Sequence, residues 1–325
     1  MNALRDERFA RMTKVLRHQR PDRMPMGDWA TVEYRPDVYH LGDDEPLPAA
    51  GEVGTTRDGK RQVTRDGGVW ATDAREKYRT PEDVLSVDLE QFEVETVGPA
   101  MLGRMAELQA SAAQHGFPIP MHYGTLVTRA TIEFGWEPFL MALALEPDRF
   151  ARLLDRFGEA SLAVVQGWVR TEGVELVFVH DDIAGTRGLL LSPACLRKHV
   201  FPWYERLLDA IHAAGRKALY VGDGNHAEAL DDLLALGMDG LYVESSSMDP
   251  AEFLPRAGRD KLFLIKTDNR IIDFGAPDDL RREFEKLRDL HRDFPGMMIY
   301  RGGGNPAPGI AEAFAELYDE LLVYE

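Results

Sequence analysis

The chain has 325 residues, of which 44% are hydrophobic and 29% charged, a composition typical of a globular protein and not of a disordered chain. Its formal net charge of -17 argues against nucleic acid or an anionic membrane surface as a general partner. The single cysteine, Cys195, excludes an intrachain disulfide and a multi-cysteine zinc site. No apolar run reaches the ~18 residues of a membrane helix and no targeting pattern is visible, so we expect a cytoplasmic protein.

The first part of the chain predicts a helical extension, a strand and an insertion. Residues 5–18 have helical spacing of apolar side chains, and residues 24–29 resemble a short strand. Residues 31–75 look irregular, apart from the turn residues at 57–60 and the return strand near 66–70 that predict a hairpin. We therefore expect residues 31–75 to be an insertion over the mouth of a barrel.

The rest of the chain alternates strand and helix around a central β-α-β unit at 174–223. The expected strands are residues 24–29, 117–121, 174–179, 218–221, 240–243, 262–265 and 297–300. Helical patterns lie between them at 98–115, 127–145, 147–172, 192–215, 226–236, 250–256, 277–291 and 309–322. This alternation predicts an α/β fold, a TIM (β/α)8 barrel forming a single domain over residues 1–325. The eighth strand is expected to be short and near Ile271-Ile272.

Charged and polar residues follow nearly every expected strand. In such folds the carboxyl ends of the strands carry the site, so these residues should converge on one mouth. They are Asp28, His122, His180, Asp181, Asp182, Asp223, Asn225, Glu244, Lys266, Asp268 and Arg301.

Two of these groups have alternative explanations. His180-Asp181-Asp182 is either a helix-capping or salt-bridging loop, or a proton donor with metal- or substrate-binding neighbours. Gly222-Asp223-Gly224-Asn225 is either a tight turn or a place where a ligand approaches the backbone, and it lacks the lysine and hydroxyl of a phosphate loop.

The remaining candidates are equally open. Glu244 and Lys266 either pair with each other or leave Lys266 as a base or nucleophile. His122 is a core histidine or a substrate contact, and Arg301 can bind a carboxylate. Cys195 lies in an expected helix and is interpreted as packing.

Several stretches, in this order and spacing, point to a known family. They are Arg20 to Pro25, Asp181 to Ile183, Leu191 to Pro193, Phe201 to Trp203, Ile211 to Gly215, Asp223 to Asn225 and Gly237 to Gly240. Together they resemble the uroporphyrinogen decarboxylase superfamily over nearly the whole chain. The resemblance implies a TIM barrel that is shared with corrinoid-linked methyltransferases.

The sequence departs from that superfamily's patterns at two places. Decarboxylases of the family have an Arg-x-x-Gly-Arg loop after the first strand, where this chain has Asp28 to Glu33, so uroporphyrinogen is a poor substrate candidate. The thiol-methylating branch has His-x-Cys-Gly and a later cysteine that bind zinc, where this chain has Val221 to Gly224 and no later cysteine. Methylation of coenzyme M is therefore not expected.

What the resemblance still implies is transfer of a methyl group from a small donor, such as an aryl methyl ether or methylamine, to a corrinoid protein. Co(I) of the corrinoid would attack the methyl carbon while an acid of the barrel protonates the leaving atom. The candidate catalytic residues are His180, Asp182, Asp223 and Glu244, and the candidate substrate-binding residues are Asp28, His122, Asp181, Asn225, Lys266 and Arg301.

Other outcomes stay open. Zinc or another divalent metal bound by carboxylates and imidazole is an alternative to a metal-free site. The resemblance also implies a homodimer. The alternative functions are a decarboxylase-like enzyme acting on a small carboxylated molecule bound by Arg301 and Lys266, and a catalytically inactive barrel that binds a ligand.

Overall fold

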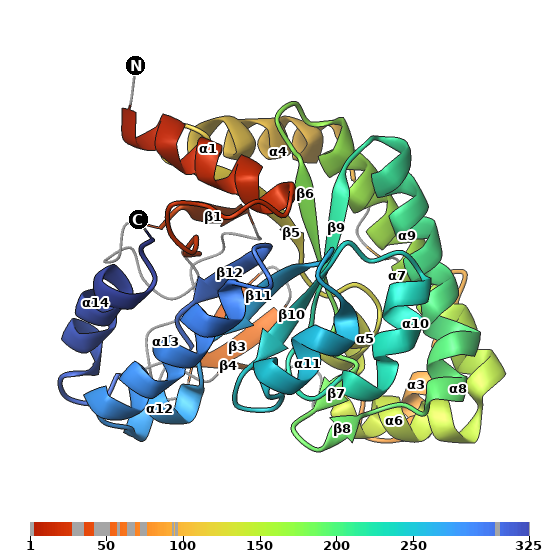
Figure 1. Ribbon diagram of the computed structural model, residues 1–325. Coiled ribbons are helices and arrows are strands. Elements are labelled where there is room, and N and C mark those ends of the chain that lie inside the picture. The colour runs from red at the N-terminus through yellow and green to blue at the C-terminus, as the bar shows by residue number, and fades with distance from the viewer. Residues whose placement is uncertain are drawn as a thin grey trace.

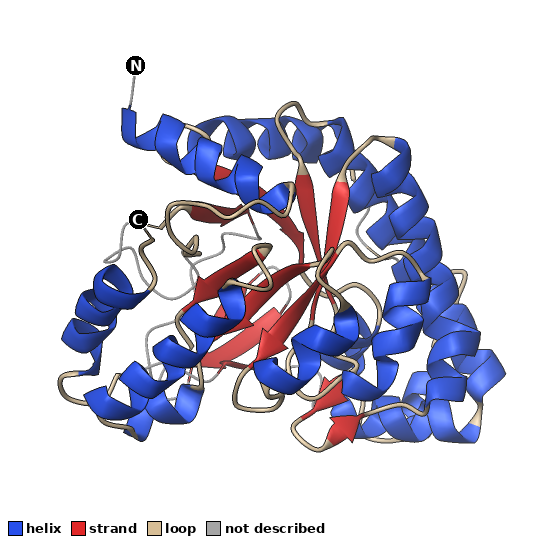
Figure 2. Ribbon diagram, in the orientation of Figure 1, coloured by secondary structure: helices blue, strands red, loops and turns tan. Residues whose placement is uncertain are grey.

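The computed structural model describes residues 3–27, 36–41, 53–56, 59–63, 69–71, 77–92, 94, 97–302 and 306–324. A group of strands forms the centre of the molecule and helices surround it (Figure 1; Figure 2). The strands are β1 (Val38–Leu41), β2 (Val53–Thr56), β3 (Gly59–Val63), β4 (Val69–Ala71), β5 (Phe117–His122), β6 (Leu176–His180), β7 (Ala184–Gly185), β8 (Gly188–Leu189), β9 (Lys217–Val221), β10 (Gly240–Glu244), β11 (Leu262–Lys266) and β12 (Met297–Tyr300).

The helices follow the strands in the alternation that the sequence predicted. They are α1 (Ala3–Leu16), α3 (Pro81–Leu85), α4 (Pro99–Ala112), α5 (Val127–Phe134), α6 (Trp136–Leu145), α7 (Pro147–Arg170), α8 (Pro193–Cys195), η2 (Leu196–Val200), α9 (Phe201–Ala213), η3 (Ala227–Ala229), α10 (Leu230–Ala235), α11 (Pro250–Ala257), α12 (Asn269–Phe274), α13 (Pro277–His291) and α14 (Ile310–Leu321). Among the residues described, no helix is both long and apolar enough to cross a membrane.

The central sheet is parallel and closes into a barrel. Seven strands pair in the order β1-β5-β6-β9-β10-β11-β12. Residues 26 and 27 complete the ring, because Met26 bridges Ile299 of β12 and Gly27 bridges Val38 of β1, both in parallel. The bonds are Gly27 N–H to the Ile299 carbonyl at 2.9 Å and Val38 N–H to the Met26 carbonyl at 3.1 Å. The predicted TIM barrel is therefore confirmed.

One strand lies elsewhere than predicted. Ile271-Ile272 is in helix α12, so the prediction of a strand there is wrong. The strand missing from the sequence analysis is β1, which pairs with β5 in parallel over Val38 to Leu41. It lies in a stretch that looked irregular. Its four residues have no clear alternation, and they form a strand because β5 and residues 26 and 27 pair with them on either side.

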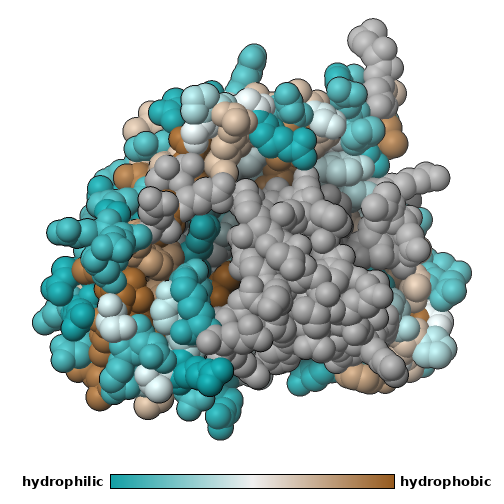
Figure 3. Space-filling model, turned by 180° about the vertical axis from the view of Figure 1, so that it is seen from behind, coloured by the Kyte–Doolittle hydropathy of each residue, from teal (hydrophilic) through white to brown (hydrophobic). Residues whose placement is uncertain are grey.

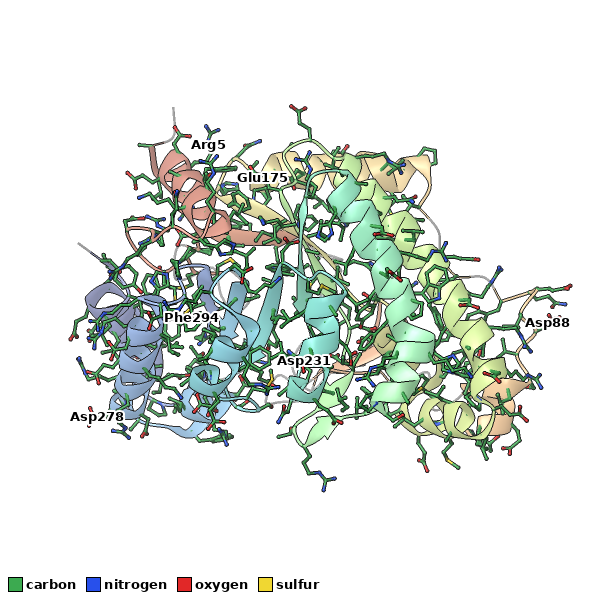
Figure 4. The ribbon with its side chains drawn as sticks, turned by 45° about the vertical axis from the view of Figure 1, so that its right-hand side comes forward. Arg5, Asp88, Glu175, Asp231, Asp278 and Phe294 are labelled. Atoms are coloured by element: carbon green, nitrogen blue, oxygen red, sulfur yellow. The ribbon has the colours of Figure 1, made fainter. Side chains whose placement is uncertain are left out.

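The inside of the barrel is a separate hydrophobic core closed at one end by α1. Alternate residues of each central strand point inward, as the period of a β-strand requires. They pack with Met12, Val15 and Leu16 of α1. Figure 4 labels Arg5 on α1 and Glu175 just before β6, and both lie at the top of the molecule, where the strands begin. The amino end of the barrel is thus filled, and the carboxyl end is the one available for a site.

Buried charges attach α1 to the first barrel residues. Arg11 of α1 donates to Asp22 at 2.9 and 2.6 Å and to Asp37 at 2.5 Å. Asp37 is fully buried and also accepts from Arg23 at 3.1 Å and from the Met26 N–H at 3.2 Å. A buried carboxylate needs such donors to offset the loss of water, so this network fixes the register of the first strand.

The outer helices largely follow the sequence signals. Ser192 caps α8 by accepting from the Cys195 N–H at 3.2 Å, and Cys195 is partly buried against the core, as expected. The helix expected over residues 127–145 divides into α5 and α6 at Gly135, whose φ of 80° cannot continue a helix.

The expected hairpin is present as the antiparallel sheet β2-β3-β4. Because β1 at Val38–Leu41 is a strand of the barrel, the insertion does not extend over all of residues 31–75, and that part of the prediction is wrong. The placement of the hairpin over the mouth stays a prediction. On the side seen in Figure 3, the described surface is mainly hydrophilic with smaller hydrophobic patches, consistent with the high charge of the chain.

Candidate active site

Four of the candidate residues lie on the inner side of neighbouring strands at their carboxyl ends. Each stands two residues after a side chain of the barrel interior, and strand alternation places His180, Glu244 and Lys266 on the same side. Asp223 lies beyond the end of β9, and its contacts with Tyr242 and Lys266 place it there too. The pairs are Phe178 and His180, Val221 and Asp223, Tyr242 and Glu244, and Leu264 and Lys266. The carboxyl end is the lower one in Figure 1, where the β7-β8 hairpin follows β6. The structure therefore brings together residues that are far apart in the sequence.

Lys266 is paired with two carboxylates. Its Nζ lies 3.0 Å from Oε1 of Glu244 and 3.6 Å from Oδ1 of Asp223. Burial lowers the pKa of Lys266, but the two carboxylates raise it by more, and the net shift is upward. Lys266 is therefore an ammonium ion at neutral pH, which argues against a role as nucleophile or base.

Glu244 accepts hydrogen bonds from three described residues. Besides Lys266, its Oε2 accepts from the Gly224 N–H and from the Ser247 hydroxyl, both at 2.9 Å. Its side chain is 10% exposed. These donors fix the position of a buried carboxylate, and they give Glu244 the role of an acceptor.

His180 and Asp182 form a second pair in the mouth. His180 Nε2 lies 3.7 Å from Asp182 Oδ1, and the His180 side chain is 9% exposed. The ring of Tyr123, which is 43% exposed, stacks on His180 with centroids 4.3 Å apart. A hydrogen bond joins this pair to Lys266, Asp223 and Glu244, because the backbone N–H of Asp223 donates to Asp182 Oδ1 at 2.9 Å. All these groups thus form one continuous site.

Asp181 has the opposite orientation from its two neighbours. Its carboxylate accepts the N–H groups of Leu126, Val127 and Thr128 at the start of α5 and the hydroxyl of Tyr204. Burial raises the pKa of Asp181, and these hydrogen bonds oppose that shift. The contacts favour the capping interpretation for Asp181, while His180 and Asp182 face the mouth.

Gly222 and Gly224, on either side of Asp223, pack closely against the backbone of Asp181 and Gly185. A Cβ at Gly222 would lie 2.6 Å from the Asp181 carbonyl oxygen. Gly224 has φ of +84°, and a Cβ there would lie 2.7 Å from the backbone of Gly185. These contacts favour the tight-turn interpretation, in which the glycines let the turn fit closely and so place Asp223.

The other candidate residues differ in burial and in their contacts. Burial lowers the pKa of His122 to about 3, so this histidine is neutral. Asn225 closes a local turn by accepting from the Ala227 N–H at 3.1 Å. Arg301 is buried directly after β12. Asp28 lies outside the described residues.

Two tyrosines of the site were not predicted from the sequence. The Tyr242 hydroxyl donates to Asp223 Oδ1 at 2.9 Å and lies 2.6 Å from the Tyr300 hydroxyl. Both looked like ordinary core residues of apolar strands. The available signal was alternation, since Tyr242 precedes Glu244 by two residues and must share its side of the strand.

The donor set does not fit a resident metal. Within the described residues, no group of three or more His, Cys, Asp or Glu side chains is placed to bind a metal ion. Lys266 lies between the nearest carboxylates, Asp223 and Glu244, and its ammonium takes the place that a cation would need.

Fold and site together define a TIM-barrel protein with an acidic, histidine-containing site at the carboxyl ends of its strands. The sequence profile of uroporphyrinogen decarboxylase (URO-D) matches residues 111–299. The chain therefore belongs to the uroporphyrinogen decarboxylase family, as its sequence motifs indicated.

Individual relatives are more distant. A uroporphyrinogen decarboxylase from Syntrophotalea carbinolica is 28% identical over 195 residues, which are 53% of this chain and 53% of that protein. The chain thus spans about half the length of this curated relative.

Two solved structures are similar to the chain to different degrees. A methyltransferase from Methanosarcina mazei has a TM-score of 0.66 at 16% identity and covers 95% of this chain and 97% of its own. A B12-independent methionine synthase from Shewanella sp. W3-18-1 has a TM-score of 0.45 at 11% identity, with coverage of 70% and 66%.

Proposed function

We propose that this protein is a methyltransferase that removes a methyl group from a small donor, such as an aryl methyl ether or a methylamine, and passes it to a corrinoid protein. The observation that carries the proposal is the pairing of Lys266 with Asp223 and Glu244 beside His180 and Asp182. The charge of the lysine is already matched by two carboxylates. The group as a whole is acidic and poorly suited to the several carboxylates of a porphyrinogen.

The site offers a proton donor next to fixed acceptors. In methyl transfer the bond from the methyl carbon to oxygen or nitrogen breaks, and the atom that stays behind takes a proton. An imidazole is the side chain most often used for such a transfer, and His180 Nε2 lies 3.7 Å from Asp182 Oδ1. Glu244 only accepts hydrogen bonds in this arrangement, so we assign the proton to His180.

In this proposal the acceptor of the methyl group belongs to a partner, the corrinoid protein. The corrinoid provides the strong nucleophile for the methyl carbon when the partner protein is bound. The likeness of fold to the Methanosarcina mazei methyltransferase over almost the whole chain supports this branch of the family. As the family resemblance implies, we propose a homodimer.

The test is a screen of methoxylated aromatics and methylamines with reduced cobalamin, in which methylcobalamin is followed by its absorbance. We expect turnover by the wild type and at least a tenfold loss in Asp223→Asn, with folding intact because the Asp223 side chain is 60% exposed. Asp319→Asn, an exposed position on α14, is the matched control and should keep full activity. Unchanged kinetics in Asp223→Asn would remove Asp223 from the site.

Other results would select the alternatives. Release of carbon dioxide from a carboxylated substrate without cobalamin would identify a decarboxylase. A ligand-induced rise in melting temperature with no turnover of any donor would identify an inactive binding barrel. Co-purification with a small corrinoid protein would support the proposed partner.

A further inference from the structure

The two carboxylate oxygens of Asp223 have different surroundings. Oδ1 accepts from the Tyr242 hydroxyl at 2.9 Å and faces Lys266 Nζ at 3.6 Å. No hydrogen bond from the described part of the chain reaches Oδ2. The side chain is 60% exposed at the carboxyl end of the barrel. One oxygen is thus fixed by the protein and the other is open to the mouth.

The direction of the hydrogen bonds follows from simple counting. A tyrosine hydroxyl has one proton, and Tyr242 gives its proton to Asp223. At the 2.6 Å contact between the two tyrosines, Tyr242 must therefore accept and Tyr300 must donate. The result is an ordered chain from Tyr300 through Tyr242 to Asp223.

The two tyrosines of this hydrogen-bond chain are buried inside the barrel. Tyr242 is fully buried and Tyr300 is 9% exposed, inside the barrel on strands β10 and β12. Their rings stack with centroids 5.8 Å apart. Burial raises the pKa of both tyrosines well above the ordinary value, so both hydroxyls keep their protons and remain donors.

We infer that Tyr242, supported by Tyr300, is the positioning residue for Asp223: it fixes Oδ1 so that Oδ2 faces the substrate. The open oxygen can take a hydroxyl, an N–H group or an ammonium of the substrate, whereas a carboxylate would be repelled by Asp223 and Asp182. This inference rests on the proposed function for the reaction that Asp223 assists, but not for the hydrogen-bond chain itself.

The hydrogen bond from Tyr242 to Asp223 is tested first without any substrate. Tyr242→Phe and Asp223→Ala are made singly and together, and urea unfolding gives the folding equilibrium constant of each variant. A hydrogen bond to a charged group predicts that the two substitutions are not additive, by about tenfold or more in that constant. Tyr318→Phe is the matched control, because Tyr318 is also buried and donates to a carbonyl, that of Met24, away from the mouth. It should be additive with Asp223→Ala.

Kinetics then separate positioning from a purely structural role. With an active donor, Tyr242→Phe should lower kcat about tenfold and change KM less than twofold, and adding it to Asp223→Ala should cause no further loss. Tyr300→Phe should act in the same direction with a smaller effect, and it serves as the second variant if Tyr242→Phe folds poorly.

The outcomes distinguish the two proposals. Additive effects of Tyr242→Phe and Asp223→Ala on unfolding would overturn the positioning role, whether or not methyl transfer is observed. An unchanged kcat for Tyr242→Phe in an active enzyme would overturn it as well. A clear coupling in unfolding, with no methyl transfer by the wild type from any donor, would refute the proposed function and leave the positioning of Asp223 in place.

Discussion

Replacement of Lys266 by methionine tests the electrostatic design of the site. The substitution keeps the volume and the apolar stem of the side chain and removes the ammonium. Glu244 is 10% exposed and lies 3.0 Å from Lys266 Nζ, a separation at which two charges attract by about 5 kcal/mol at an effective dielectric constant of ~20. Asp223 is 60% exposed and 3.6 Å away, so solvent screens its contribution to roughly 0–1 kcal/mol.

Most of the cost should therefore come from Glu244. Removing one partner of a buried pair leaves the other charge without compensation, which costs about 3–5 kcal/mol. We expect Lys266→Met to lower the free energy of unfolding by that amount, as measured by urea denaturation followed by circular dichroism at neutral pH. The double variant Lys266→Met with Glu244→Gln should recover a large part of it, because an amide still accepts from Gly224 and Ser247.

The pH dependence has a definite sign. The pKa of Lys266 is raised in the folded protein above its ordinary 10.5, so the folded state binds the proton more tightly than the unfolded chain does. The contribution of Lys266 is then fully present below pH 10.5 and is lost as pH rises further. The difference between wild type and Lys266→Met should be constant near neutrality.

A surface pair provides the control. Lys286 and Asp249 are 2.5 Å apart, but their side chains are 41% and 43% exposed, so Lys286→Met should cost less than about 1 kcal/mol. If Lys266→Met costs no more than this control, or if Glu244→Gln brings no recovery, the pair is not an electrostatic determinant of the site and the reasoning fails.

Two further predictions concern stability. Arg11→Met should destabilise the protein by about 3 kcal/mol in urea unfolding, because it removes a partner of the buried Asp37. Arg5→Met on the exposed side of the same helix is the control and should change stability by less than about 1 kcal/mol. Equal effects of the two substitutions would show that the ion pairs of Arg11 do not stabilise the fold. Burial raises the pKa of Glu283 from 4.5 to about 7, so ionisation destabilises the folded state as pH rises through that interval. Glu283→Gln should therefore gain about 2–3 kcal/mol relative to wild type between pH 4.5 and 7.5, and a pH-independent difference would contradict the raised pKa.

Much of the fold could be predicted because its signals are local. An apolar run that ends in charge, followed by a helix cap such as Ser192, identifies each β-α unit without knowledge of the rest. The strand-end position of Glu244 and Lys266 follows from the same pattern. Strand β1 could not be predicted, because its four residues form a strand only through pairing with β5 and with residues 26 and 27.

The contacts that neighbouring side chains make in the site depend on the tertiary structure. Asp181 and Asp182 are adjacent and chemically identical, yet the Asp181 carboxylate caps α5 and the Asp182 carboxylate accepts from the Asp223 N–H in the mouth. Tyr242 and Tyr300 are 58 residues apart, and their hydroxyls meet only once the ring has closed. The sequence by itself determined which residues stand at strand ends. Closure of the barrel decided which of them meet, because residues that are far apart in the sequence become neighbours only when their strands pair in register.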